Sequence, residues 1–275
     1  MRTIAIFYVF WALKNTAPKL LLLIVAYHPS ESEVNTLSAS LDNLPEHIAY
    51  AVIANDFRHG ECIEKLANNA YMFLRNGQNI GYGRAINLLF KKLPTIPEYI
   101  GILNSDLSWN SGTFSRIINF MESNTDVSLL TPKIISPSGN TQYLCKQHPT
   151  ILGMVSRRFI PNLIKPRWLC LYDRWYTMSH QDYESIFDVP YLSGCCMVAR
   201  STSFILSGGF DESFFLYLED ADLTRSLSLT GRCIHYPFES VIHQWGRGNY
   251  KNFFLMLVNL YSAYIYFKKW GLRLW

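Results

Sequence analysis

Residues Lys19–Tyr27 read KLLLLIVAY, and the polar turn His28-Pro29-Ser30 follows directly. The apolar run is continuous rather than alternating, which is typical of a strand that is covered on both faces, as in a parallel sheet. Working outward from it, we predict strands at 48–54, 71–74, 99–103 and 127–130, and helices at 33–44, 62–69, 84–92 and 111–123. Strands that alternate with helices at this spacing predict an α/β sandwich with a mainly parallel sheet.

The regular pattern stops between Pro132 and Pro190, where prolines and basic residues occur without a sustained period. We interpret this stretch as a loop-rich region over an acceptor site, not as a separate domain. Regular signals return at 191–200 and 201–208. The chain is therefore predicted to form one domain with a C-terminal appendage.

The composition of the 275-residue chain excludes several classes of protein. Hydrophobic residues make up 49% and charged residues 17%, so a sizeable core can form and wholesale disorder is excluded. The net charge of +4 is too small for a protein that coats nucleic acid, but it suits contact with an anionic membrane surface. The six cysteines include no C-x-x-C pair, which argues against a zinc site or a disulfide scaffold and indicates a reducing, cytoplasmic setting.

Both ends of the chain carry apolar segments outside the predicted sheet. The N-terminal extension, residues 1–18, holds an apolar run too short to span a bilayer, and we expect it either to pack on the domain or to act as an interfacial anchor. Near the other end, residues 253–267 read FFLMLVNLYSAYIYF and are flanked by basic and tryptophan residues. Such flanks predict that 249–275 form an amphipathic helix that covers the core, contacts a membrane, or does both.

The turn at 76–84, NGQNIGYGR, precedes a predicted helix. Gly81 and Gly83 would let the backbone approach a ligand closely, and Arg84 at the helix start can reach a phosphate. The turn is neither a P-loop nor a dinucleotide fingerprint, because the glycine and lysine spacings of those motifs are absent. A phosphate-binding turn and an ordinary helix entry both fit this stretch taken alone.

Carboxylates follow apolar runs at two further points. Asn104-Ser105-Asp106 offers one carboxylate at a strand end, and Asp106 either holds a divalent metal against a diphosphate or caps the next helix. Residues 208–223, GGFDESFFLYLEDADL, set acidic residues among aromatic ones, which suits a general base, although an acidic helix start gives the same pattern. His243 follows a strand-like run and is either a structural residue or a metal ligand.

Together these stretches resemble family 2 of the glycosyltransferases, whose catalytic domain has the GT-A fold. The resemblance runs in order from Leu20 to Gly271 and is carried by IVAYHP, by N-x-x-N-x-G-Y-G-x-A-x-N from Asn76 to Asn87, by LNSD ending at Asp106, and by SGCCMVAR…GGFDESFFLYLEDADL from Ser193 to Leu223, followed by His243. The last stretch is the most specific, because its glycines, aromatic residues and acids recur in the family order.

The resemblance implies a Rossmann-like, mainly parallel central sheet flanked by helices. The catalytic domain would span 19–248, with a nucleotide-sugar half at 19–130 and an acceptor half at 131–248, between the extension at 1–18 and the helix at 249–275.

Individual residues acquire roles from the resemblance. Asp220 would deprotonate the acceptor hydroxyl, and Glu219 would shape the acceptor side of the site. Asp106 and His243 would hold Mg²⁺ or Mn²⁺. The donor-binding residues would be Tyr27, Asn55 and Asp56 beside the base and ribose, Asn76, Gly81, Gly83, Arg84 and Asn87 around the diphosphate, and Ser105 and Asp106 beside them.

The implied activity is inverting transfer of a sugar from a nucleotide diphosphate donor, with dTDP-rhamnose as the first expectation and a UDP-hexose as the second. The acceptor would be a lipid-diphosphate-linked saccharide in the synthesis of bacterial surface polysaccharide, such as the O-antigen of lipopolysaccharide or a capsule. We therefore expect a peripheral protein on the inner face of the cytoplasmic membrane, with no nucleic-acid partner. A non-catalytic carbohydrate-binding or scaffold protein of the same fold, and a glycoside hydrolase, are the alternatives.

Overall fold

The computed structural model describes residues 17–244 and 253–275, so the predicted extension at 1–18 falls almost wholly outside the described residues, as does the predicted boundary at 249. The helices and strands are β1 (Leu20–Ala26), α2 (Glu31–Leu41), β2 (Ile48–Asn55), η1 (Cys62–Asn68), β3 (Met72–Asn76), α3 (Tyr82–Lys91), β4 (Tyr99–Asn104), β5 (Leu107–Trp109), α4 (Thr113–Ser123), β6 (Val127–Ile135), α5 (Ile151–Phe159), η2 (Asn162–Ile164), α6 (Arg167–Tyr176), β7 (Phe187–Asp188), β8 (Cys196–Arg200), α7 (Ser201–Leu206), α8 (Glu219–Leu227), β9 (Arg232–His243) and α9 (Phe253–Trp270).

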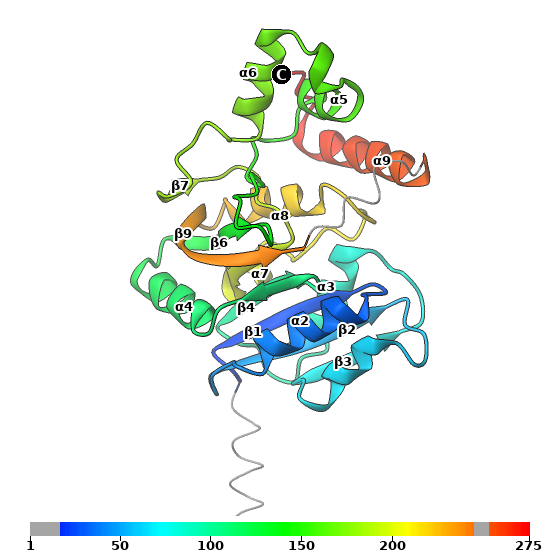
Figure 1. The fold of residues 1–275 in the computed structure, drawn as a ribbon, viewed down its shortest axis with the longest axis vertical. Helices are drawn as coiled ribbons and strands as arrows, with labels where there is room; N and C mark the ends of the chain where they lie inside the picture. Colours follow the sequence, from blue (N-terminus) through cyan, green and yellow to red (C-terminus); the bar gives the residue numbers. More distant parts are fainter. Residues whose placement is uncertain (1–16, 245–252) are drawn as a thin grey trace, which may run out of the picture.

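One sheet in the described part of the chain has the strand order β3-β2-β1-β4-β8-β6-β9-β5, and β7 also pairs with β9 (Figure 1). Strands β3, β2, β1 and β4 are parallel neighbours, and β6 and β9 are parallel to each other. The inserted strand β8 is antiparallel to both β4 and β6, so all six of these strands share one direction. Every residue of β1 is buried. The predicted α/β fold with a mostly parallel sheet is confirmed.

Alternate residues of β1 face two different hydrophobic cores, as the pleat of a strand requires. Leu20, Leu22 and Ile24 pack in the core that contains residues of α2 and α4. Leu21, Leu23 and Val25 pack in the core that contains residues of α3 and α8. Helices therefore cover both faces of the sheet, which explains why the sequence of β1 is continuously apolar.

The stretch at 132–190 is more regular than predicted. Strand β6 continues to Ile135, and α5 and α6 form a helical hairpin at one end of the molecule's long axis (Figure 1). Both helices are amphipathic, although each buries only two residues, so the prediction missed a period that the sequence does contain. Polar contacts hold the pair together: Thr150 caps α5 and also bonds to the Tyr172 hydroxyl at 2.7 Å, and Ser156 Oγ donates to Asp173 Oδ2 at 2.9 Å.

Helix α9 packs on the start of α8 rather than standing apart as an appendage. Its residues Ala263, Tyr266 and Phe267 share a third core with Phe214, Leu218 and Ala221. The helix was expected to be amphipathic, but it is apolar on its exposed side as well, where Phe254, Leu257, Tyr261 and Tyr264 lie. Within the described residues, no helix is long and apolar enough to cross a membrane.

Candidate active site

Polar residues predicted from four separate motifs gather at one edge of the sheet. Asn55 at the end of β2 pairs in register with Asn76 at the end of β3, and Val25 of β1 pairs with Asn104 of β4. Tyr27 follows β1, is 54% exposed, and lies beside the His28 ring. Because the carboxyl ends of parallel strands meet at the same edge, ligands of open α/β sheets bind at this place.

Asn55 is buried, and its side-chain amide supports the turn that follows β3. Its Oδ1 accepts hydrogen bonds from Asn76 Nδ2 at 3.2 Å and from Ile80 N at 3.1 Å. Its Nδ2 donates to Asn79 Oδ1 at 3.0 Å and to Gly81 O at 3.3 Å. All four hydrogen-bonding positions of the amide are thus used within the protein, so Asn55 fixes the shape of the predicted donor-binding turn.

A second polar cluster joins the ends of β1 and β2. His28 Nε2 lies 2.9 Å from Asp56 Oδ2, and His28 Nδ1 lies 2.5 Å from Glu61 Oε1. Hydrogen bonding to Asp56, with help from Glu61, raises the pKa of His28, and the same bond lowers the pKa of Asp56. Both His28 and Asp56 have positive φ angles, 46° and 66°, a strained backbone that occurs often at functional sites. Glu61 carries no motif, which is why sequence reasoning missed it.

The glycines before α3 allow another part of the chain to approach closely. A Cβ atom on Gly81, whose φ is 88°, would lie 2.2 Å from the carbonyl oxygen of Phe215. A Cβ atom on Gly83 would lie 2.8 Å from Phe210 Cβ. The start of α3 is therefore pressed against the segment at 210–215, which leads into α8.

Asn87 and Arg84 also bind this segment. Asn87 is buried, donates to Phe210 O at 2.8 Å and accepts from Phe210 N at 3.0 Å. Arg84 Nε donates to Glu212 O at 2.5 Å. The contacts that the structure gives these two side chains connect α3 to the segment before α8, and their role at a donor diphosphate stays a prediction.

Asp106 and His243 meet because β5 pairs with β9 in an antiparallel register that sets Leu107 opposite His243. Asp106 Oδ2 lies 3.2 Å from His243 Nε2. Gln142 orients the imidazole: its Nε2 donates to His243 O at 2.9 Å, which points its Oε1 at His243 Nδ1, 3.1 Å away. His243 Nδ1 then donates to Gln142, and Nε2 faces Asp106. Gln142 lies in the stretch without a sequence pattern and was not predicted.

The chemistry of this pair fits a divalent cation. A carboxylate oxygen and an imidazole nitrogen face each other, and the second oxygen, Asp106 Oδ1, is buried without a hydrogen-bond partner among the described residues. Such electron-pair donors are satisfied by a bound cation. In the part of the chain that the structure describes, no group of three or more His, Cys, Asp or Glu side chains is arranged so that it could hold a metal ion. Asp106 and His243 would therefore supply the protein ligands, and substrate phosphate and water the remaining ones.

Asp220 lies in the first turn of α8. The two residues before the helix, Tyr217 and Leu218, have left-handed φ angles of 71° and 63°, so the chain enters the helix through a strained turn. Asp220 Oδ2 accepts the N–H of Gly194 at 3.0 Å, and its Oδ1 accepts the N–H of Ala221 at 3.0 Å. The carboxylate is thus held in one orientation while its side chain stays only partly buried.

Glu219 differs from its neighbour in burial and in charge. It is 5% exposed, and its Oε2 has no hydrogen-bond partner within residues 17–244 and 253–275. Burial, with the negative charge of Asp220, raises the pKa of Glu219 to about 8. Glu219 therefore holds a proton at neutral pH.

Residues Gly194 and Cys195 connect the two predicted carboxylates. Gly194 N binds Asp220, and Cys195 O accepts from the backbone N–H of Asn104, two residues before Asp106. Burial raises the pKa of the Cys195 thiol to about 12, and the negative charges of Asp106 and Asp220 both add to that rise. Asp106 and Asp220 consequently both lie near this segment, with Ser105 in the turn next to Asp106.

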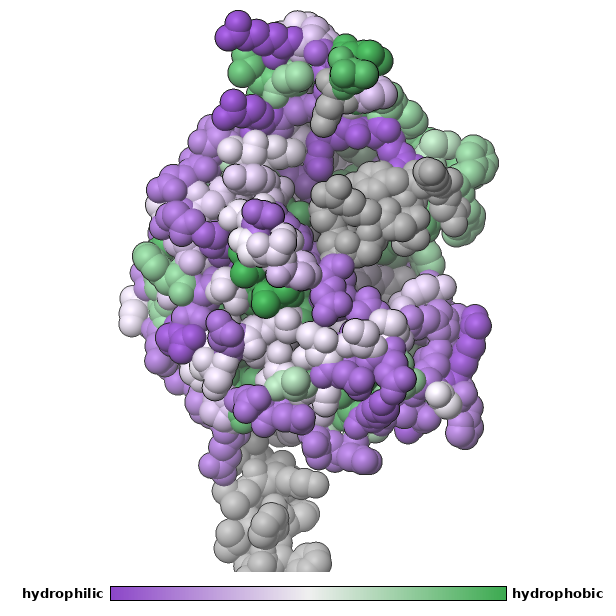
Figure 2. Space-filling view, in the orientation of Figure 1, coloured by the Kyte–Doolittle hydropathy of each residue, from purple (hydrophilic) through white to green (hydrophobic). Residues whose placement is uncertain are grey.

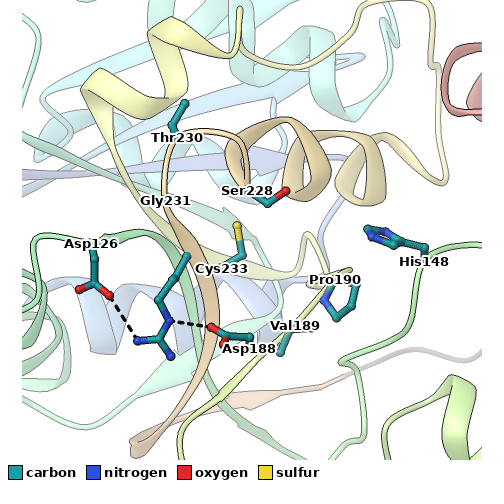
Figure 3. Close-up of a pocket in the computed structure, with 10 residues that line it drawn as sticks. Asp126, His148, Asp188, Val189, Pro190, Ser228, Thr230, Gly231 and Cys233 are labelled. Atoms are coloured by element: carbon teal, nitrogen blue, oxygen red, sulfur yellow. Dashed lines mark hydrogen bonds and ion pairs between the residues drawn. The ribbon is translucent and has the colours of Figure 1, made fainter.

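A cavity of about 580 Å³ lies elsewhere, between β7, the end of α8 and the start of β9 (Figure 3). Its walls include Arg232, which bonds to Asp188 at 2.8 Å and to Asp126 at 3.3 Å. None of the predicted site residues lines it. The predicted site is instead the open edge of the sheet between Asp106 and Asp220.

Comparison with known proteins gives one family for this chain. Residues 52–204, more than half of the chain, match the sequence model of the family described as "Glycosyl transferase family 2". The "N-acetylglucosaminyl-diphospho-decaprenol L-rhamnosyltransferase" of Mycobacterium tuberculosis (strain ATCC 25618 / H37Rv) is 28% identical over 182 residues, which is 62% of this chain and 57% of that protein. The chain thus matches little more than half the length of this relative.

Two further proteins extend the similarity. The "Rhamnosyltransferase WbbL" of Escherichia coli (strain K12) is 25% identical over 231 residues, or 80% of this chain and 82% of that protein. Among solved structures, "GalNAc-T7 with UDP, GalNAc and Mn2+" matches with a TM-score of 0.63 at 13% identity, and covers 92% of this chain and 48% of that one. This structural match bears on the fold alone.

Proposed function

The chain belongs to glycosyl transferase family 2 and has the GT-A fold, and we propose that it transfers a sugar from a nucleotide diphosphate donor to a lipid-linked saccharide. The observation that carries the proposal is that Gly194 binds Asp220 while the adjacent Cys195 binds the backbone of Asn104, two residues before Asp106. Sugar transfer needs positive charge beside the leaving diphosphate and a base beside the incoming hydroxyl. The Asp106–His243 pair and Asp220 are suited to these two tasks.

Asp220 is the proposed general base. The acceptor hydroxyl oxygen forms a bond to the anomeric carbon of the donor sugar while the bond from that carbon to the diphosphate oxygen breaks. The hydroxyl proton moves to Asp220, and the products are an inverted glycoside and a nucleoside diphosphate. The N–H groups of Gly194 and Ala221 hold the carboxylate in place for this transfer. The protonated Glu219 adds no second negative charge and shapes the acceptor side.

On the donor side, Asp106 and His243 would hold Mg²⁺ or Mn²⁺, which supplies positive charge against the leaving diphosphate when it is bound. The presence of Mn²⁺ with UDP in the matched GalNAc-T7 structure supports this choice. The turn at 76–81, fixed by Asn55, and the exposed Tyr27 would bind the nucleotide. Gln142 keeps His243 in the orientation that ligand binding needs.

The names of the relatives support particular substrates. Both sequence relatives are rhamnosyltransferases, so dTDP-rhamnose is the first donor to test and UDP-hexoses are the second. The mycobacterial relative is named for a diphosphate-linked lipid that carries N-acetylglucosamine. We take a lipid-diphosphate-linked saccharide of bacterial surface polysaccharide synthesis, such as that of O-antigen, as the acceptor.

An acceptor of this kind places the enzyme at the inner face of the cytoplasmic membrane. Helix α9 supports peripheral contact there, because apolar side chains such as Phe254, Tyr261 and Tyr264 are 60% exposed or more. Lys268 and Lys269 follow in its last turn. Exposed aromatic residues beside cations suit the interface of an anionic bilayer.

Replacing the base tests the proposal. The Asp220→Asn variant should lose about 10²–10⁴-fold in transfer rate, because Asn cannot take the proton. It should still be stabilised against heat by dTDP or UDP with Mn²⁺, because the donor side is intact. Asp211→Asn is the matched control: its carboxylate lies in the same segment but binds Ser213 and Lys269, so turnover should change by no more than a few fold.

Near-normal turnover of Asp220→Asn would remove Asp220 from the role of base. A wild-type protein that turns over none of a panel of nucleotide sugars, and that no nucleotide stabilises, would instead point to a non-catalytic carbohydrate-binding protein of this fold.

A further inference from the structure

Lys146 is a cation beside the proposed base that the mechanism so far does not use. Its backbone pairs with that of Tyr191 through hydrogen bonds of 3.0 and 3.1 Å, and its ammonium lies 4.3 Å from the centre of the Tyr191 ring. The side chain is partly buried, and no carboxylate within residues 17–244 and 253–275 forms an ion pair with it. A cation that is partly withdrawn from water without a counter-ion costs free energy that an anionic ligand would recover.

A second cation and the proposed base both lie within electrostatic range of Lys146. Burial, followed by the positive charge of Arg157, lowers the pKa of Lys146 to about 8, while the charge of Asp220 acts in the opposite direction. Burial raises the pKa of Tyr176, the positive charge of Arg157 lowers it, and the negative charge of Asp220 raises it further. The packing agrees for the base, because Tyr191, which Lys146 contacts, shares the third core with Ala221, the residue after Asp220. Arg157 is in the last turn of α5. At neutral pH Lys146 still carries most of its charge.

The close packing of α5 against α6 positions Arg157. A Cβ atom on Gly153 would lie 2.6 Å from the ring of Tyr176, so only glycine allows α5 to approach so near. The backbone of α5 is also fixed at its start, where Ile151 N and Leu152 N donate to the carbonyl oxygens of Arg273 and Leu274 at 3.0 and 2.9 Å. Helix α5 thus carries a second, exposed cation, Arg157, on a backbone that is fixed at its start.

The same helical hairpin exposes a large apolar surface. Its exposed members are Ile151, Val155, Phe159, Leu163, Ile164, Trp168 and Leu171, and Leu163 is 96% exposed. Figure 2 shows hydrophobic side chains at this end of the molecule next to hydrophilic ones. Exposed apolar patches of this size mark contact with lipid or with a partner. An anion that binds at Lys146 would therefore have an apolar surface close by, which suits a phosphate group on a lipid.

We propose that Lys146 and Arg157 form the subsite that binds the diphosphate of a lipid-linked acceptor, and so set the acceptor saccharide against Asp220. The inference rests on the proposed function and adds to it a determinant of acceptor specificity. Two cations that flank a diphosphate give charge-assisted hydrogen bonds, which are about twice as strong as neutral ones. The subsite would thus favour diphosphate-linked acceptors over neutral glycosides.

Kinetics with two matched acceptors test the subsite in detergent micelles without anionic lipid. One acceptor carries N-acetylglucosamine on a lipid diphosphate, and the other carries the same sugar on a phosphate-free alkyl chain. The Lys146→Met variant keeps the contact with the Tyr191 ring but loses the charge. It should raise the KM of the diphosphate acceptor about tenfold or more, and change the KM of the neutral acceptor and of the donor by about twofold at most. Lys146→Arg should restore most of the loss.

Arg157→Gln should act in the same direction as Lys146→Met, whereas Arg167→Gln, which removes an exposed cation at the start of α6, is the control and should have little effect. A rise in the donor KM would assign Lys146 to the donor diphosphate and overturn the proposal. Equal losses with both acceptors would overturn it too, because Lys146 would then contact the sugar or support the fold.

A binding measurement separates this inference from the proposed function. Farnesyl diphosphate in the presence of EDTA probes the subsite without turnover and without a metal-bound donor site. Titration calorimetry should show binding to the wild type that Lys146→Met weakens about tenfold or more, even if no tested donor is turned over. Equal binding by wild type and variant, or no binding by the wild type, would contradict the subsite.

Discussion

Gly81 is needed for two independent reasons, both visible at its own α-carbon. Its φ of 88° lies in the region that side chains avoid, and the carbonyl of Phe215 occupies the place of a Cβ atom. In the structure the backbone that approaches this turn closely is the protein's own segment at 210–215. The close approach of a ligand stays a prediction. The contact with Phe215 connects the donor-side turn to the segment that carries Asp220.

We expect Gly81→Ala to lower the free energy of unfolding by about 2 kcal/mol or more, through backbone strain and the clash with Phe215. Gly77 lies in the same turn with open space around its α-carbon. Gly77→Ala should therefore change the free energy of unfolding by about 0.5 kcal/mol at most. Urea unfolding of the two variants measures the difference. Equal stabilities would show that the turn relaxes freely at Gly81.

Glu219 gives a pH-dependent prediction. Its pKa is about 8 in the folded protein against 4.5 ordinarily, so the folded state keeps a proton that the unfolded state loses. The contribution of Glu219 to the free energy of unfolding therefore falls as pH rises from about 4.5 to about 8. Glu219→Gln removes this loss. The melting temperature of the variant, relative to that of the wild type, should therefore increase as pH rises from about 4.5 to about 8, by roughly 2–4 °C for each kcal/mol.

Thermal melts between these pH values measure that gain. Glu212→Gln is the matched control, because hydrogen bonding to Lys91 lowers the pKa of Glu212 and leaves no titration in the same range. A difference between Glu219→Gln and the wild type that stays constant with pH would contradict the raised pKa.

Among the helices, α9 packs against α8 and the turn before it, which carry the proposed base. The buried carboxylate of Asp222 lies 2.9 Å from Lys269 Nζ and accepts from Trp270 Nε1 at 2.7 Å. Ser262 Oγ donates to Leu216 O at 2.8 Å, in the turn that leads to Glu219. Because α8 carries Asp220, we expect that detachment of α9 would break these contacts and change the position of the base.

Asp222→Asn should leave Lys269 beside a neutral amide and cost about 1–3 kcal/mol, which lowers the melting temperature by roughly 2–10 °C. Trypsin should then cleave faster after Lys268 and Lys269, because α9 detaches more often. Glu31→Gln breaks an exposed ion pair with Lys65 and should have little effect on either measurement. Unchanged cleavage in Asp222→Asn would mean that the apolar contacts of α9 suffice.

Across the whole molecule, most of the exposed large apolar residues lie on the helical hairpin and on α9, and the hairpin forms one end of the long axis (Figures 1 and 2). The hairpin adds Arg157, Arg158, Arg167 and Arg174, against one acid, Asp173, which pairs with Lys165. This end of the molecule is therefore both apolar and basic, the combination that binds an anionic bilayer.

The full chain should sediment with anionic vesicles at low salt and less with neutral ones. Part of the binding should persist at about 1 M salt, where the screening length is about 3 Å, because the apolar contribution is not screened. Replacing Phe254, Tyr261 and Tyr264 by serine should reduce the persistent part, since these side chains are exposed. No binding at either salt concentration would remove the membrane from the proposed function.

The alternation of strands and helices was predictable because each element carries its own apolar period or a continuous apolar run, as β1 does. The hairpin of α5 and α6 was missed although both helices are amphipathic, because they are short, bury few residues and are separated by Pro161 and Pro166. Among site residues, Asp106, Asp220 and His243 were found from motifs, whereas Gln142, Glu61 and Lys146 have no local pattern. Their importance comes from neighbours that are distant in the sequence.

The amino-acid pattern alone shows that the apolar strands end in polar residues, because hydrophobic periodicity is a local property. Parallel strands then place those residues at one edge of the sheet. The packing of distant segments brings Asp106 and Asp220 near Gly194 and Cys195 and keeps Glu219 protonated. It also leaves Lys146 without a carboxylate partner among residues 17–244 and 253–275. Burial and charge at a point depend on every chain segment that packs there, and no stretch of sequence contains that information alone.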